Sequence, residues 1–195
     1  MHQTMAPLAV SAYTMTSALG RGRQAHLDAI ADMRSALRSN DFSQAPLDCH
    51  IGRVDGLEEL TFPERHRHWD CRNNRLAWLG LMQDDMIDAV RDARQRHGAR
   101  RIAVLMGTST GSIDSTEQAY RRLDQGRLPE DLRDRAIHCL HSLSAFVAEA
   151  LELAGPTLTL STACSSSAKA FAMGERMIRQ GLVDAALVGG VDSLC

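Results

Sequence analysis

The sequence predicts an α/β fold, with a mostly parallel sheet covered by helices. The run Ile102–Met106 contains no polar residue, which is typical of a strand that is buried on both faces. Residues 155–193 have the pattern of a strand, a turn, a helix and a second strand, and such a unit joins parallel strands by a right-handed crossover. Strand-like and helical segments alternate along the rest of the chain, as this class requires.

The composition is that of one globular domain. The chain has 195 residues, of which 44% are hydrophobic and 24% are charged, so it can bury a core of its own. A net charge of −2 and the lack of a long basic run argue against nucleic acid binding. No apolar run approaches the roughly 20 residues of a membrane span, and residues 1–11 lack the pattern of a secretory signal. We therefore expect a cytoplasmic protein.

Cysteine and histidine spacing gives no sign of a metal site. The five cysteines are scattered and form no CxxC pair, which argues against zinc and against a disulfide framework. The run Arg65–Trp69 could suggest a metal or an acidic partner. No further ligand residues stand at zinc-like spacing, so a solvated loop is favoured. We expect no metal and no cofactor.

The first half of the chain contains four predicted elements. These are a strand at Leu8–Thr14, a helix over residues 23–38, a short strand at Ile51–Val54 and, after a polar irregular segment, one long helix over residues 74–97. Gly98 is the stop signal of that last helix.

A glycine-rich turn, Gly107–Gly111, follows the buried strand directly. Such a turn can cradle a phosphate, but this one lacks the lysine of a P-loop and the spacing of a dinucleotide fingerprint. A tight turn that needs a positive φ is the favoured interpretation. Helical patterns then cover residues 114–125 and 129–153, and Gly155-Pro156 ends them.

Cys164 lies where a predicted strand, containing Leu158 and Leu160, passes into a helix. Apolar residues recur after it at helical spacing: Ala168, Phe171, Ala172, Met177 and Ile178. Ser165 or Ser166 can cap this helix, Gly181 ends it, and Ala185–Val188 is the next strand. Free N–H groups at a helix start stabilise a thiolate, and the small neighbouring side chains leave the sulfur accessible. A buried, inert thiol is the alternative.

Several segments in the same order resemble the β-ketoacyl-acyl-carrier-protein synthases, condensing enzymes of fatty acid and polyketide synthesis. The segments are Asn73–Leu76, Val104–Gly111, Ser161–Ser167, Ile178–Gly181 and Asp184–Asp192. The cysteine followed by three serines is also reminiscent of polyketide and aryl-polyene synthases. The resemblance implies a thiolase-like fold.

The resemblance also implies a mechanism and partners. Cys164 would accept an acyl chain from a carrier-protein or coenzyme A thioester, and a malonyl-carrier thioester would lose carbon dioxide and attack the acyl-cysteine. The Cys164 N–H would donate to the developing oxyanion. Gly107, Thr108 and Gly111 would line the substrate cavity, and Thr162 would reach across a dimer interface. The partners implied are an acyl carrier protein and a second copy or a related subunit.

Members of this family are about twice as long and consist of two similar halves. Residues 1–195 resemble the first half, while two histidines and a lysine of the family site belong to the second. We therefore expect this chain alone to be inactive in condensation. Two other classes stay open: a non-catalytic partner subunit that sets chain length, and a cysteine hydrolase or degradative thiolase.

Overall fold

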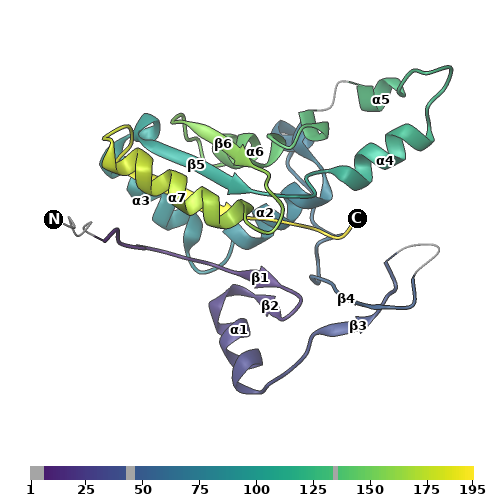
Figure 1. Ribbon diagram of the computed structural model, residues 1–195, viewed down its shortest axis with the longest axis horizontal. Coiled ribbons are helices and arrows are strands. Elements are labelled where there is room, and N and C mark those ends of the chain that lie inside the picture. The colour runs from purple at the N-terminus through teal and green to yellow at the C-terminus, as the bar shows by residue number, and fades with distance from the viewer. Residues whose placement is uncertain (1–6, 43–46, 134–135) are drawn as a thin grey trace.

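A parallel three-stranded sheet with helices on both faces forms the centre of the protein (Figure 1). The structure is a computed structural model, and it describes residues 7–42, 47–133 and 136–195. The strands are β5 (Ile102–Gly107), β6 (Thr157–Leu160) and β7 (Ala185–Gly190), in the spatial order β6-β5-β7. The predicted α/β class and its buried central strand are confirmed.

Side chains of β5 alternate between two hydrophobic clusters, one on each face of the sheet. Ile102, Val104 and Met106 pack with the helices α2, α3 and α6, while Ala103 and Leu105 pack with α7. All six residues of β5 are buried. This is the environment that an uninterrupted apolar strand requires, because both of its faces are covered.

Four helices form the two outer layers of the sheet. On one face lie α2 (Arg72–Leu81), α3 (Met86–His97) and α6 (Ser142–Ala150), and on the other lies α7 (Ser166–Arg179). The connecting segments contain α4 (Ile113–Arg121), α5 (Glu130–Arg133) and the 3₁₀ turns η1 (Glu64–Trp69), η2 (Ala99–Arg101) and η3 (Ala136–His138). No helix in the described ranges is long and apolar enough to cross a membrane.

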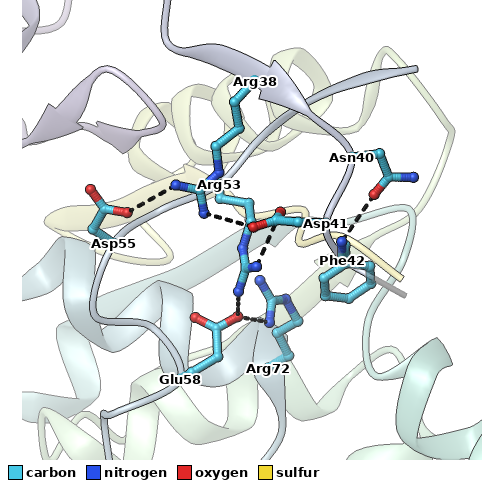
Figure 2. Close-up of polar contacts among 8 residues, drawn as sticks. All are labelled: Arg38, Asn40, Asp41, Phe42, Arg53, Asp55, Glu58 and Arg72. Carbon is cyan, nitrogen blue, oxygen red and sulfur yellow. Dashed lines mark hydrogen bonds and ion pairs between the residues drawn. The ribbon is translucent and has the colours of Figure 1, made fainter. Parts of the chain in front are cut away.

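The N-terminal elements form a smaller lobe beside the sheet layers (Figure 1). It contains α1 (Gly22–Ala31) and two antiparallel pairs, β1 (Thr16–Ser17) with β2 (Gly20–Arg21) and β3 (Leu37–Ser39) with β4 (His50–Gly52). A chain of ion pairs ties the second pair to the start of α2. Arg38 contacts Asp41, Arg53 lies between Asp41 and Glu58, and Glu58 contacts Arg72 (Figure 2).

The predicted strand Leu8–Thr14 is wrong. The segment makes no ladder with the sheet, and Val10 is 72% exposed. The sheet has two outer edges, on β6 and β7, and the segment pairs with neither. The end of the segment is held elsewhere, because the Thr14 hydroxyl donates to the Gly80 carbonyl at 3.2 Å.

The long helix predicted over residues 74–97 is two helices. Asp84 and Asp85, between α2 and α3, have φ values of 55° and 57°, a left-handed conformation that aspartate tolerates better than most residues. The break turns the Asp84 carboxylate toward the start of α1, where it accepts the Arg23 N–H at 2.9 Å. A contact between distant segments therefore overrides the local helical pattern.

Two other predicted helices are shorter than expected. The helix over residues 23–38 ends at Ala31, and Leu37 begins β3 instead. The region 129–153 divides into α5, η3 and α6. The segment Arg65–Trp69, predicted as a solvated loop, belongs to η1. It is not fully solvated, because His66 is buried and its Nδ1 lies 2.9 Å from Glu149 Oε1 in a hydrogen bond.

Candidate active site

Three chain segments meet at the carboxyl edge of the parallel sheet. The turn 107–111 follows β5, the loop 161–165 follows β6, and residues 191–195 follow β7. Ligands of open α/β sheets bind outside the carboxyl ends of the strands, because the loops there are free to vary while the strands fix their positions. Cys164 lies in the second of these segments.

The loop that carries Cys164 is closed by its own hydroxyl groups. The Ser166 hydroxyl accepts the Thr162 N–H at 2.8 Å and donates to the Ala163 carbonyl at 2.7 Å. Ala163, directly before the cysteine, has a φ of 53°, which costs energy for a residue with a side chain. This sharp reversal leaves Cys164 exposed two residues before the start of α7, at the junction of strand and helix that the sequence predicted.

Ser165 occupies the position before the first helical residue, but its side chain does not cap α7. Its hydroxyl instead donates to the Thr162 carbonyl at 3.0 Å and lies 3.0 Å from the Thr162 hydroxyl. The prediction that Ser165 or Ser166 caps α7 is therefore wrong, because both hydroxyls bond to the backbone of the cysteine loop and hold its reversal.

The start of α7 rests directly on two glycines of the sheet. A Cβ added at Gly107 would lie 2.7 Å from the Ser167 nitrogen and 2.8 Å from the Ser166 carbonyl carbon. A Cβ at Gly190 would lie 2.0 Å from the Ser167 hydroxyl oxygen. Glycine at these positions allows the helix to approach the ends of β5 and β7, and this approach fixes the place of Cys164.

The turn 107–111 is held from beneath and from the side. Thr108 is fully buried, and its hydroxyl oxygen accepts the Gly111 N–H at 3.1 Å and the Asn73 side-chain N–H at 3.3 Å. The same hydroxyl donates to Asp192 Oδ1 at 3.0 Å. Gly111 has a φ of 52°, as a tight turn requires.

Asp192 also occupies the backbone donors of this turn. Its Oδ1 accepts the Ser109 N–H at 2.7 Å and the Thr110 N–H at 3.1 Å. A phosphate cradle needs such N–H groups to face a ligand. Here they face a carboxylate of the protein, which supports the tight-turn interpretation over a nucleotide site.

The predicted site residues have different environments. Gly107 lies under the helix that follows Cys164, Thr162 is exposed in the cysteine loop, and Thr108 is buried under its turn. Gly111 is also buried, with the Leu140 side chain beside it. The catalytic and substrate-lining roles of these residues stay predictions. The sequence analysis did not single out Asp192, although an acidic residue two positions after a strand that ends in two glycines was visible.

The apolar face predicted for α7 is partly wrong. Ala170, Gly174 and Met177 are its buried residues besides Ser166, while Phe171 is 57% exposed. Ala172 is exposed as well. Ala170, Gly174 and Met177 face the sheet, because residues at steps of four and three lie on the same side of a helix.

The other cysteines do not form a second site with Cys164. Cys71 is buried, and burial raises the pKa of its thiol to about 11. Cys49, Cys139 and Cys195 are exposed. The sulfur of Cys195 is nevertheless partly buried, and this burial, together with nearby acidic side chains, raises the pKa of the Cys195 thiol. In the described part of the chain, no group of three or more His, Cys, Asp or Glu residues is arranged to hold a metal ion.

Comparison with known families gives this geometry a context. Residues 75–195 match the family model described as Beta-ketoacyl synthase, N-terminal domain. The chain belongs to the β-ketoacyl synthase family. It is 27% identical, over 97% of its own length, to "Putative polyketide beta-ketoacyl synthase 1" of Streptomyces virginiae, and this alignment covers 47% of that protein.

Solved ketosynthase structures share the fold. A structure of the ketosynthase ApeO in complex with its chain length factor ApeC, from Xenorhabdus doucetiae, matches with a TM-score of 0.76 at 36% identity, over 93% of this chain and 46% of that chain. The ishigamide ketosynthase/chain length factor matches with a TM-score of 0.71 at 19% identity, over 93% of this chain and 52% of that chain. The thiolase-like fold of β-ketoacyl synthases is thereby confirmed, and this chain spans about half the length of the relatives it matches.

Proposed function

We propose that this chain carries the nucleophile of a decarboxylating β-ketoacyl synthase that works in polyketide or fatty acid synthesis. The observation that carries the proposal is the place of Cys164. It is exposed on a strained reversal, at the carboxyl edge of a sheet with the β-ketoacyl synthase fold. A covalent acyl acceptor needs such a thiol, accessible to a thioester carbonyl and close to backbone N–H groups.

The proposed reaction has two steps. The Cys164 sulfur attacks a thioester carbonyl, and the acyl group moves to the cysteine while the carrier thiol leaves. A malonyl thioester then loses carbon dioxide, and the resulting carbanion attacks the acyl-cysteine carbonyl and releases the thiolate. The Cys164 N–H would donate to the oxyanion in both attacks. Groups outside residues 1–195 would complete the decarboxylation, and the chain alone would be inactive in condensation.

The partners proposed are an acyl carrier protein and a second subunit of the same family. One solved relative is described as a type II polyketide synthase acyl-carrier protein in complex with its ketosynthase, and two others are complexes of a ketosynthase with a chain length factor. In this chain β6 is an edge strand, and Leu158 on it is 41% exposed. Thr162, two residues after the end of β6 in the cysteine loop, would then lie near the partner subunit.

A non-catalytic subunit of the chain-length-factor type is the second candidate. The structural relatives that contain both kinds of subunit favour it as much as the first. Cys164 supports the first candidate, because a subunit without a catalytic role has no need for an exposed thiol on a strained reversal before a helix. The first candidate is therefore the conclusion.

The decisive experiment is acylation of the protein as its gene encodes it. The protein is incubated with an acyl thioester of an acyl carrier protein, and intact mass and peptide mapping locate the acyl group. We expect one acyl group on the peptide with Cys164, none in Cys164→Ala, and unchanged acylation in Cys139→Ala, a control at another exposed cysteine. Acylation that persists in Cys164→Ala would place the nucleophile elsewhere, and none in the parent would favour the non-catalytic subunit.

A further inference from the structure

Asp192 binds the turn that lies beside the cysteine loop, although 84 residues separate it from Thr108. Four donors converge on its Oδ1: the Thr108 and Thr110 hydroxyls at 3.0 and 3.1 Å, and the Ser109 and Thr110 N–H groups at 2.7 and 3.1 Å. A single carboxylate oxygen therefore gathers most of the polar groups at the top of the turn. Hydrogen bonds to an ionised acceptor are about twice as strong as neutral ones.

Few other contacts fix the same turn. The Thr108 N–H donates to the Leu160 carbonyl at 3.1 Å, and the Ile113 N–H donates to the Thr110 carbonyl at 3.1 Å. The first bond joins the turn to the end of β6, just before the cysteine loop, but it acts only at the base. Ser109 and Thr110 are at the tip, where Asp192 supplies the hydrogen bonds.

The contacts of Thr108, on the buried side of the turn, fix the position of the turn in the fold. Thr108 is fully buried, and its hydroxyl oxygen makes one donated and two accepted hydrogen bonds, which is its full capacity. Asn73, 1% exposed on α2, supplies one of them. Asp192 follows β7, Asn73 lies in α2 and Thr108 follows β5, so residues from three separate parts of the fold hold the turn in one position.

We infer that Asp192 is a positioning residue for acyl transfer at Cys164, which it serves by holding the turn 107–111 as a fixed wall beside the cysteine loop. The inference rests on the proposed function for the identity of the reaction. Gly107, at the base of the wall, touches the first turn of α7, so a displaced wall changes the space over the thiol. Asp192 acts through the turn and need not touch the substrate.

The test compares three variants of the protein as its gene encodes it. Asp192→Ala removes the acceptor, Asp192→Asn keeps an oxygen at the same place, and Asp184→Ala is a matched control. Asp184 precedes β7 at its other end and pairs with Arg101 at 2.8 Å, far along the strand from the turn. The measurements are kcat/KM for acyl transfer to Cys164, the iodoacetamide labelling rate of Cys164, and amide exchange at Ser109 and Thr110.

In Asp192→Ala we expect kcat/KM to fall by about 10- to 100-fold, the size of effect that a small misplacement of a substrate-positioning group produces. Exchange at the two amides should rise at least about tenfold, while labelling by the small reagent changes less than about twofold. Asp192→Asn should recover most of the transfer rate, and Asp184→Ala should equal the parent. A merely structural role would lower transfer and labelling together.

The inference is overturned if Asp192→Ala transfers acyl groups at the parent rate, if Asp192→Asn is as impaired as Asp192→Ala, or if labelling falls in proportion to transfer. Failure of the proposed function looks different, because the parent itself would then not be acylated. In that case the amide exchange still reports on the turn. Unchanged exchange at Ser109 and Thr110 in Asp192→Ala would show that Asp192 does not hold it.

Discussion

Gly107→Ala tests whether the sheet fixes the position of the cysteine loop by direct contact with α7. The new methyl group would lie 2.7 Å from the Ser167 nitrogen, about 0.7 Å short of the 3.4 Å at which ordinary contact begins. The atoms it meets are backbone atoms of the first helical turn, and these cannot rotate away as a side chain can. Either α7 or β5 must therefore move.

The expected loss of stability follows from two opposing effects. Overpacking a close contact costs about 1–3 kcal/mol, and replacing glycine by alanine returns about 0.4–1 kcal/mol by restricting the unfolded chain. The net destabilisation then lies between about 0 and 2.6 kcal/mol, with a central value of about 1.3 kcal/mol, which for a domain of this size lowers Tm by about 3–5 °C. Thermal unfolding measures the change, and amide exchange over residues 165–168 locates it.

Gly80→Ala is the matched control, because Gly80 lies inside α2 and its nearest neighbours are Thr16 atoms at 3.8 and 3.9 Å. With space for the methyl group, this substitution should stabilise the protein by about 0.5–1 kcal/mol through helix propensity. The reasoning is refuted if Gly107→Ala melts at or above the parent Tm. An equal loss in Gly80→Ala would show that any added methyl group in a packed layer has the same effect.

Three further predictions concern ionisable groups. Burial raises the pKa of Asp84, but hydrogen bonds from Thr14 and Arg23 outweigh burial and hold that pKa below its usual range, so the carboxylate stabilises the protein above about pH 5 and loses this effect as pH falls through the lowered pKa. The difference in urea midpoint between the parent and Asp84→Asn should therefore shrink from about pH 7 to about pH 3, and a constant difference would contradict this. Glu149→Ala should cost about 1–3 kcal/mol in urea unfolding, because it leaves the buried His66 ring and the Trp69 N–H without their acceptor, whereas Glu149→Gln, which keeps one, should cost less. Cys71, which is 4% exposed and has a thiol pKa of about 11, should react with iodoacetamide last of the five cysteines, and peptide mapping that finds it modified as early as Cys164 would argue against its burial.

Local patterns predicted the parts of the fold that need only local causes. The apolar run Ile102–Met106 became β5, and the change of period after Cys164 became α7. Gly98 and Gly181, with φ values of 84° and 69°, end their helices as glycines do. Each of these segments has one strong local preference for strand, helix or helix end, and no contact with a distant segment competes with that preference.

The predictions failed where a distant contact competes with the local pattern. Residues 8–14 have the composition of a strand, but the segment forms no ladder with the sheet, and its end is bound to α2 through the Thr14 hydroxyl and the Gly80 carbonyl. The pattern over residues 74–97 is helical throughout, yet the break at Asp84 gives the Arg23 N–H, in the first turn of α1, a hydrogen-bond acceptor. Neither outcome can be derived from the spacing of residues in one segment.

The same distinction separates the two halves of the candidate site. The cysteine loop is closed by hydroxyls within five residues, Thr162–Ser166, so the run of serines contained the information to place the thiol. The neighbouring turn is closed by Asp192 and Asn73, which are remote from it in sequence, and nothing in their own segments indicates that they bind it. A candidate nucleophile can therefore be proposed from its local sequence, whereas the wall that would orient its substrate is built by the assembled sheet and becomes apparent only in the fold.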